Sequence, residues 1–225
     1  MMAKNQLKNK ITKKLIVFDV GGVLVKERSC WVTVRMGLGQ SVIRKCAALR
    51  RKYFSSKTMS YENWAKEDVK LWGNVNLKEI KKILDKVLLT NGAKETCKTL
   101  KNKGYSLAII STGLNVLVER VKKELNIDYA FYNGLYEKNR KLLVKVNVSL
   151  DKNPKDKILR KLIKKLRIKK EDVVVVGDNE DDRSMMKLAG FSIVFNPDYK
   201  KSKMARKTAD LVIRKRDLRE ILKYL

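Results

Sequence analysis

The sequence contains no histidine among its 225 residues, and this absence excludes more chemistry than any other feature of its composition. Without an imidazole, the chain cannot build a serine–histidine triad, a cysteine–histidine pair or the histidine-based zinc site of many metalloproteases. Any catalysis must therefore use carboxylates, lysine, hydroxyl groups, thiols or a metal ion held by oxygen atoms.

Cysteine is also scarce, since the chain has only Cys30, Cys46 and Cys97. They are odd in number and form no CxxC pair, so neither a disulfide framework nor a zinc knuckle is expected. This usage favours the reducing cytoplasm. No apolar run approaches the roughly 20 residues of a membrane span, and no membrane partner is expected. The basic residues 1–13 lack the apolar stretch of a signal peptide and are interpreted as a frayed end.

Acidic residues are few, with 24 against 53 lysines and arginines, and the formal net charge is +29. The excess is spread along the whole chain, which favours a general lysine bias on a solvated surface. A strongly positive field also attracts phosphates and nucleic acid, so a polyanionic partner stays open as an alternative. Apolar residues make up 44% of the chain, enough for a folded core.

Short apolar runs alternate with stretches of helical spacing along the chain. This alternation predicts an α/β fold with a doubly wound, mostly parallel sheet and helices on both faces. Alternating residues at 129–148 predict a β-hairpin, and Pro154 suits the first turn of a helix. The expected strands are residues 15–18, 106–110, 173–176, 192–195 and 211–213, and the other expected helices are 29–50, 60–88, 93–103, 114–125, 181–189 and the C-terminal end.

The long helical stretch at residues 26–91 follows the first strand and is interpreted as an inserted helical cap. Residues 1–25 and 92–225 then form the Rossmann-like core. Trp31, Trp64 and Trp72 all fall in the cap. We expect them in its interior, although one that faced the cleft would contribute to substrate specificity.

Oxygen-bearing side chains follow three of the predicted strands, namely Asp19, the pair Ser111 and Thr112, and Asp178. Open α/β sheets bind ligands at these carboxyl ends. Two facing carboxylates repel unless a cation lies between them, and oxygen ligands without histidine favour Mg²⁺. The ion and Lys155 would attract a phosphate, which Ser111 and nearby amides would hold. Taken singly, each residue is also compatible with a helix cap or a turn.

The order of these motifs resembles the haloacid dehalogenase superfamily, in its phosphoserine-phosphatase-like branch, over residues 14–225. LIVFDVGGVLV resembles the first motif, IISTG the second, NPKDKIL the third and VVVVGDNEDD the fourth. Each motif alone is weak, but four in order at compatible spacing are specific.

The resemblance implies a phosphomonoester hydrolase that acts through an aspartyl-phosphate intermediate. Asp19 would attack the phosphoryl group, while Ser111, Thr112 and Lys155 would bind its oxygens. Lys155 would also stabilise the developing charge. The substrate would be a small phosphorylated molecule, and the protein a monomer or a homodimer.

The resemblance also implies a Mg²⁺ site. The residues that it assigns to the ion are Asp19, Gly21 through its carbonyl oxygen, Asp178, and Asp182 as a supporting group.

Two positions depart from the family pattern. The family usually has a second aspartate two residues after the nucleophile, and here that position is Gly21. A general acid is worth about 10²–10⁴-fold in rate. Three consequences stay open: a slow phosphatase or one that prefers good leaving groups, replacement by Glu27 from the cap side, or an impaired relative that binds phosphate, nucleic acid or a protein partner.

The second departure is Arg28, which stands where phosphoserine phosphatases have a glutamate that recognises the amino group. Arginine favours an anionic group, so we expect an anionic phosphoester other than phosphoserine, of unidentified structure.

Overall fold

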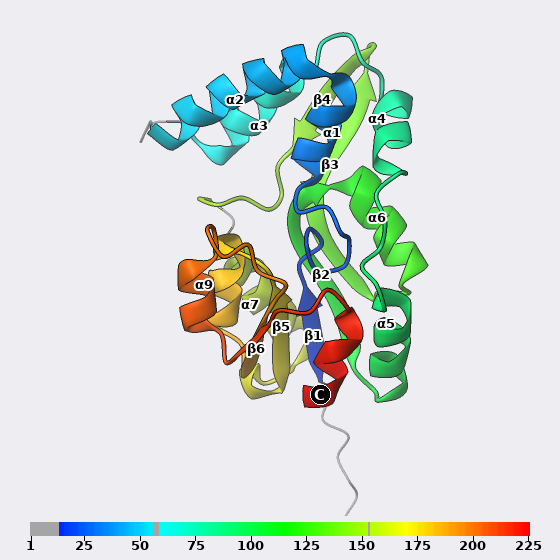
Figure 1. Cartoon of the computed structure of the whole chain (residues 1–225), viewed down its shortest axis with the longest axis vertical. Coiled ribbons are helices and arrows are strands. Elements are labelled where there is room, and N and C mark those ends of the chain that lie inside the picture. The colour runs from blue at the N-terminus through cyan, green and yellow to red at the C-terminus, as the bar shows by residue number, and fades with distance from the viewer. Residues whose placement is uncertain (1–13, 56–58, 153) are drawn as a thin grey trace, which may run out of the picture.

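A seven-stranded sheet lies at the centre of the computed structural model (Figure 1). The structure describes residues 14–55, 59–152 and 154–225. The strand order is β4-β3-β2-β1-β5-β6-β7, and all neighbours are parallel except β3 and β4. The predicted frayed end, residues 1–13, lies outside the described residues. The strands are β1 Leu15–Phe18, β2 Ser106–Leu114, β3 Tyr129–Lys138, β4 Lys141–Lys145, β5 Val173–Gly177, β6 Phe191–Phe195 and β7 Leu211–Ile213.

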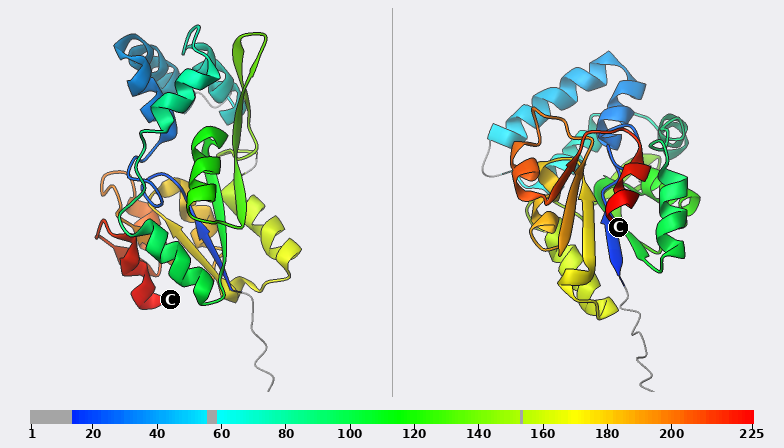
Figure 2. Two further views of the ribbon diagram at one scale, coloured as in Figure 1. Left: turned by 90° about the vertical axis from the view of Figure 1, so that its right-hand side faces the viewer. Right: turned by 60° about the horizontal axis from the view of Figure 1, so that its bottom comes forward.

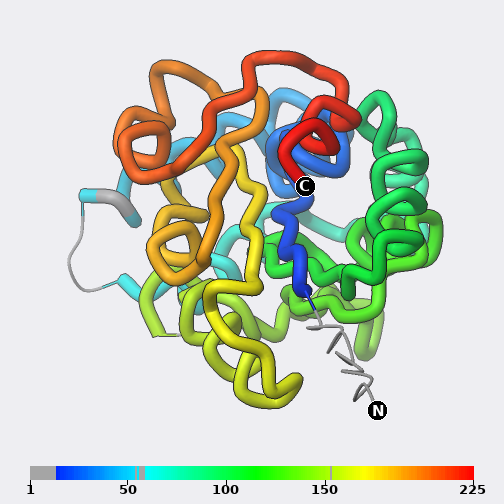
Figure 3. The backbone as a smooth tube through the Cα atoms, turned by 90° about the horizontal axis from the view of Figure 1, so that it is seen from below, coloured from blue at the N-terminus to red at the C-terminus, as the bar shows by residue number. Residues whose placement is uncertain are grey.

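The central strand β1 is buried on both faces, which explains its uninterrupted apolar sequence. Leu15 and Val17 pack into one hydrophobic cluster, and Ile16 and Phe18 pack into the other. Figure 3 shows green segments on one side of blue β1 and yellow and orange segments on the other. The predicted doubly wound α/β class is therefore confirmed.

Helices cover both faces of the sheet, as Figure 1 shows. On the side of the C-terminus are α5 Ala93–Asn102, α6 Asn115–Glu124 and the 3₁₀ helix η3 Leu218–Tyr224. On the other side are α7 Lys155–Leu166, α8 Arg183–Met186 and α9 Lys203–Thr208, with the 3₁₀ helices η1 Lys170–Asp172 and η2 Glu180–Asp182.

Four helices gather at one end of the molecule, above the carboxyl ends of the strands (Figure 2). The two long predicted helices are each broken in two. Gly39, with a φ of 100°, separates the first pair. Asn76 starts the last of the four with a capping box, in which Glu79 returns a hydrogen bond. The helices are α1 Cys30–Leu38, α2 Gln40–Ser55, α3 Tyr61–Lys70 and α4 Leu77–Leu84.

The β3–β4 hairpin rises beside these four helices (Figure 2). Its two-residue turn, Asn139 and Arg140, has φ values of 51° and 58°, as a type I′ turn requires. The predicted hairpin is confirmed, although its second strand ends at Lys145. Near its tip, Glu137 Oε2 accepts a hydrogen bond of 3.0 Å from the Leu77 amide at the start of α4.

Other element boundaries differ from the sequence prediction. The helix expected at 181–189 is a 3₁₀ turn followed by the four-residue α8, and the C-terminal helix is of the 3₁₀ type. Helix α9 was not predicted, because its one buried apolar residue, Ala205, gives no helical stripe. Within the described part of the chain, no helix has the length and apolar character needed to cross a bilayer.

Candidate active site

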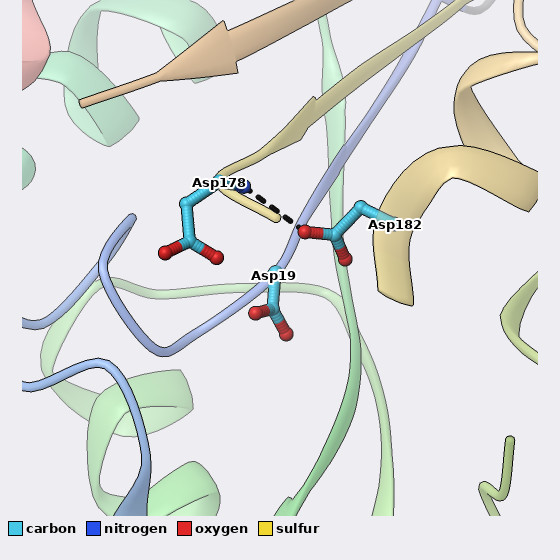
Figure 4. Close-up of side chains that lie close together, drawn as sticks. All are labelled: Asp19, Asp178 and Asp182. Atoms are coloured by element: carbon cyan, nitrogen blue, oxygen red, sulfur yellow. Dashed lines mark hydrogen bonds between the residues drawn. The ribbon is translucent and has the colours of Figure 1, made fainter. Parts of the chain in front are cut away.

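Three buried carboxylates meet at the carboxyl ends of β1 and β5. Asp19 directly follows β1, Asp178 follows β5, and Asp182 lies one turn further along. One oxygen from each lies within 4.8 Å of the others, and Figure 4 shows the three side chains converging. The structure thus brings together predicted residues that are up to 163 positions apart in sequence, from Asp19 to Asp182 (182 − 19).

Lys155 is the buried cation of this cluster. It is the first residue of α7, where Pro154 precedes it in an extended conformation. Its Nζ lies 2.9 Å from Asp19 Oδ1 and 2.6 Å from Asp182 Oδ1. Burial lowers the pKa of Lys155, but the carboxylates of Asp182 and Asp19 outweigh it and the pKa is raised. Lys155 therefore stays charged and holds the nucleophile candidate in place.

The four acidic residues between positions 178 and 182 have different surroundings in the structure. Asp182 Oδ2 accepts the Asp178 amide at 3.0 Å, the contact dashed in Figure 4. Glu180 turns away and accepts the Met204 amide at 2.7 Å, at the start of α9. Asp181 is not one of the three clustered carboxylates, and it lines the cavity that opens over them. Only Asp178 and Asp182 of this run belong to the buried cluster.

The carboxylates carry more negative charge than their surroundings neutralise. Burial raises the pKa of Asp178, and the nearby charges of Asp182 and Asp19 raise it further, while Arg28 opposes the shift. Burial also raises the pKa of Asp182, against the attraction of Lys155. Buried, closely spaced carboxylates with raised pKa values are stabilised by a bound cation, and an all-oxygen set fits a hard ion such as Mg²⁺.

Ser111 lies at an irregularity in β2. The pairing of β2 with β3 shifts register between Ile110 and Leu114, so this stretch leaves the regular ladder. The buried Ser111 hydroxyl oxygen accepts the Gly113 amide at 3.1 Å. The sequence predicted a strand end here, whereas β2 continues through the irregular stretch to Leu114.

The carbonyl oxygen of Thr112 is the acceptor for three side chains. Trp31 Nε1 donates to it at 3.1 Å, Asn133 Nδ2 at 3.0 Å and the Tyr61 hydroxyl at 3.5 Å. Trp31 lies in α1 and Tyr61 in α3. Two of the four helices α1 to α4, which we call the upper helices, are therefore tied to the strand that carries Ser111. Trp31 was expected in the cap interior, but Tyr61 and Asn133 were missed by the sequence analysis, because their contacts with Thr112 join distant segments.

A cavity of about 630 Å³ opens over the carboxylates. Its floor includes Asp19, Ser111, Lys155 and Asp178. Aromatic residues of the upper helices line it as well: Trp31, Tyr53, Tyr61 and Trp64. Trp31, Trp64 and Trp72 are buried, and the Trp31 ring lies 5.2 Å and 5.8 Å from the other two. The tryptophans therefore form a packed cluster, of which two members also reach the cavity wall.

Arg28 also lines the cavity. Its guanidinium pairs with the Asp178 carboxylate and donates to the Asn196 carbonyl oxygen at 2.6 Å. Asn196 follows β6 and has a φ of 43°. No sequence signal marks Asn196, since it acts through its backbone.

Gly21 lies in the loop that follows Asp19, against the backbone of Arg28. A Cβ atom at Gly21 would lie 2.3 Å from the Arg28 carbonyl oxygen, which is too close for any side chain. The adjacent Gly22 donates its amide to the Glu27 carbonyl oxygen at 3.0 Å. The loop is therefore folded back on residues 27 and 28.

Glu27 lines the same cavity. Its Oε2 atom is buried and has no hydrogen-bond partner among the described residues. Glu27 thus lies in the wall of the cavity and Arg28 against Asp178, both just before α1.

Comparison with known proteins identifies relatives of this chain. The family model of haloacid dehalogenase-like hydrolases matches residues 13–190. Phosphoserine phosphatase of Methanocaldococcus jannaschii is 36% identical over 214 residues, which cover 95% of this chain and 98% of that protein. Phosphoserine phosphatase of Archaeoglobus fulgidus is 33% identical over 186 residues, 82% of this chain and 53% of that one.

Solved structures agree with this similarity. A phospho-aspartyl intermediate analogue of phosphoserine phosphatase superposes with a TM-score of 0.80 at 35% identity and covers 95% of this chain and 99% of its own. A substrate-bound phosphoserine phosphatase complex gives 0.79 at 34% identity, with coverage of 95% and 98%.

Proposed function

The chain belongs to the haloacid dehalogenase-like hydrolases and is a phosphatase, and we propose that it hydrolyses a small anionic phosphomonoester with Mg²⁺ through a phosphorylated Asp19. The observation that carries this proposal is the buried cluster of Asp19, Asp178 and Asp182 with Lys155 at its centre. Turnover is favoured over binding alone, because the relatives that cover most of the chain are named as phosphatases.

Each residue of the cluster has a role in this scheme. Asp19 attacks phosphorus, and the P–O bond to the alcohol or phenol group breaks, so that this group leaves with the bonding electron pair. Lys155 orients the Asp19 carboxylate and neutralises the phosphoryl oxygens. Ser111 and the amides beside it bind the same oxygens. Water then attacks phosphorus, the bond between phosphorus and Asp19 breaks, and inorganic phosphate leaves with the free Asp19 carboxylate restored.

The metal site would use Asp19, Asp178 and the carbonyl oxygen of Gly21, while Asp182 holds Lys155 and the Asp178 amide. A bound Mg²⁺ would supply charge neutralisation at the phosphoryl group.

Gly21 offers no carboxyl group to protonate the leaving group. Alkyl phosphates need such a proton and should react slowly, whereas aryl phosphates depart readily without one. The enzyme is therefore proposed to be slow on alkyl esters unless Glu27, on the cavity wall, supplies the proton.

Phosphoserine is the first natural substrate to test, because the relatives are named for it. Arg28 opposes a substrate ammonium group and favours a second anionic group instead. We therefore propose that phosphoesters with a carboxylate or second phosphate and no ammonium are better substrates than phosphoserine.

The four upper helices are proposed to act as a cap over the cavity, with residues 26–91 as the cap domain. The two connecting segments run side by side, and Lys26 and Thr90 donate their amides to Leu88 and Leu24 at 3.0 Å and 2.9 Å. This paired connection is the proposed hinge. The three free, buried cysteines suit the proposed cytoplasmic location.

The experiment that tests the proposal is release of p-nitrophenol from p-nitrophenyl phosphate with and without Mg²⁺, for the natural protein and Asp19→Asn. We expect turnover that needs both the ion and Asp19. No turnover by the folded, Mg²⁺-treated natural protein, or equal turnover by Asp19→Asn, would exclude the proposed mechanism.

A further inference from the structure

We propose that Arg28 is a displaceable counter-ion of Asp178, which a second anionic group on the substrate draws away, so that substrate recognition and metal binding are coupled. This inference rests on the proposed function and deepens it. It concerns the order in which charges enter the site and the kind of substrate that the site selects.

Asp178 is fully engaged in the structure. One of its oxygens pairs with the Arg28 guanidinium, and the other accepts the side-chain amide of Asn179. The Asp178 side chain is only 1% exposed, while that of Arg28 is 38% exposed. The contact therefore joins a buried anion to a cation that reaches it from the cavity.

Charge balance explains why Arg28 occupies this place. Ion pairs join three carboxylates, Asp19, Asp178 and Asp182, to two cations, Lys155 and Arg28, so these five groups in contact carry 2 − 3 = −1. A divalent ion changes that sum to −1 + 2 = +1, with the ion and the guanidinium beside the same carboxylate. Like charges at about 4 Å repel by several kcal/mol near a protein surface. Metal binding at Asp178 therefore disfavours Arg28 in its observed position.

The side chain of Arg28 is free to leave, whereas its backbone is held. The Arg28 carbonyl lies against Gly21, and the neighbouring Glu27 carbonyl accepts the Gly22 amide. The exposed guanidinium is otherwise tied only to the Asn196 carbonyl oxygen among the described residues. A rotation of the side chain alone would move the positive charge from Asp178 into the cavity.

An anionic group on the substrate gives that charge a new partner. A phosphoester with a nearby carboxylate or second phosphate would bind the released guanidinium through that second anionic group. Coupling of this kind is reciprocal: the anionic ligand tightens metal binding, and the metal tightens ligand binding by the same factor. An alkyl phosphate whose only anionic group is the phosphoryl group provides no such second partner, so Arg28 stays in competition with the metal.

The test measures Mg²⁺ affinity by calorimetry, without turnover, for the natural protein, Arg28→Met and the control Lys201→Met. Lys201 lines the same cavity, and its amino group lies 4.0 Å from Asp198. The control removes the same charge without touching Asp178. Arg28→Met should bind Mg²⁺ about tenfold more tightly than the natural protein, and Lys201→Met should change far less, if the coupling has the usual size.

Two ligands that cannot be hydrolysed distinguish the effect of a second anionic group on Mg²⁺ affinity from the effect of the phosphoryl group. Phosphonoacetate carries a carboxylate, and methylphosphonate does not. In the natural protein, phosphonoacetate should raise Mg²⁺ affinity more than methylphosphonate does, and in Arg28→Met the two should act alike. Equal effects in the natural protein, or Mg²⁺ affinity unchanged or weaker in folded Arg28→Met, would overturn the inference.

Failure of this inference is distinguishable from failure of the proposed function. If p-nitrophenyl phosphate is hydrolysed in a reaction that needs Mg²⁺ and Asp19, but Arg28→Met binds Mg²⁺ like the natural protein, only the counter-ion role is wrong.

Arg28→Lys is a second variant, which keeps the positive charge. It should bind Mg²⁺ more weakly than Arg28→Met does.

Discussion

Gly21 is the position at which this site departs from the family pattern of two aspartates. Gly21 lacks the carboxyl group of the usual second aspartate, and the structure adds a steric reason. The Arg28 carbonyl oxygen occupies the space that any side chain at position 21 would need. Gly21 and the position of Arg28 are therefore one feature of the folded loop rather than two separate departures.

Restoring the aspartate should consequently fail. We predict that Gly21→Asp does not accelerate hydrolysis of an alkyl phosphate, because the loop must first move off Arg28. Gly21→Ala should lower the free energy of unfolding by about 1–3 kcal/mol, as overpacking does. Gly134→Ala is the matched control, since its Cβ would meet its nearest neighbour at 3.9 Å. Urea unfolding measures both, and a stable, faster Gly21→Asp would contradict the steric argument.

The thiols should be unreactive in the native protein. Burial raises the pKa of Cys30 to about 11 and those of Cys46 and Cys97 to about 12. A thiol with a raised pKa stays protonated at pH 8, and its reactive thiolate forms only as the pH approaches that pKa. We predict negligible reaction with Ellman's reagent at pH 8 and reaction of all three thiols in urea. Rapid reaction of the folded protein would show that this burial is wrong.

Site residues that follow a predicted strand could be predicted from the sequence. Asp19, Ser111 and Asp178 follow apolar runs, and the shared geometry of parallel strands predicts that they meet. Asn196 and the donors to Thr112 were not predictable, since backbone acceptors and contacts across the chain leave no local pattern. Trp31 shows the same limit, because its place in the predicted cap suggested burial but not its hydrogen bond to the Thr112 carbonyl oxygen.

At the scale of elements, the irregular part of β2 joins the site to the upper helices. Trp31 from α1 and Tyr61 from α3 donate to Thr112, beside Ser111, and Tyr61 also donates its amide to Asp151 Oδ2 at 2.7 Å. These contacts form one edge of the proposed cap. The paired connection at residues 24–26 and 88–90 forms the other.

Closure of the cap should slow amide exchange. With Mg²⁺ and a phosphate mimic bound, we predict slower hydrogen exchange at residues 25–28, at 89–92 and along α1, because a closed cap opens less often. Helix α7, apart from its first turn at Lys155, is the internal reference and should not change. Exchange that is the same with and without the ligands at both hinges would rule out closure.

Element positions were predictable from apolar spacing, but their ends were not. The parallel strands were found because each is a short apolar run, and the alternation of apolar and polar residues at 129–148 predicted the hairpin. The breaks at Gly39 and before Leu77 were missed, since helical spacing continues across them and only capping interrupts it. Helix α9 is held by Glu180 from a distant turn, which no local pattern reveals.

At the scale of the whole molecule, the charge of +29 is a property of the surface and not of one site. Exposed basic residues lie on α2, such as Arg44, Arg51 and Lys52, and equally on α7, such as Lys161, Lys164 and Lys165. Within the described part of the chain, no ion pair involves these six residues. The distribution therefore predicts attraction of polyanions without a defined binding surface.

Binding of single-stranded RNA tests this prediction. Affinity should be weak at physiological salt and fall steeply as salt rises, because binding releases counter-ions. Changing the three α2 residues to glutamine should weaken binding as much as changing the three α7 residues. Loss confined to the α2 variant would contradict a general surface effect and indicate a nucleic-acid site beside the cavity.

The central claim is that Asp19 carries the phosphoryl group during turnover. The most direct measurement is acid quenching of the protein during reaction with p-nitrophenyl phosphate and Mg²⁺, followed by mass spectrometry of its peptides. We predict the added mass of one phosphoryl group on the peptide containing Asp19, in high yield because no side chain at position 21 activates water. Product formation with an unmodified Asp19 peptide, or with the phosphoryl group on another residue, would contradict the account.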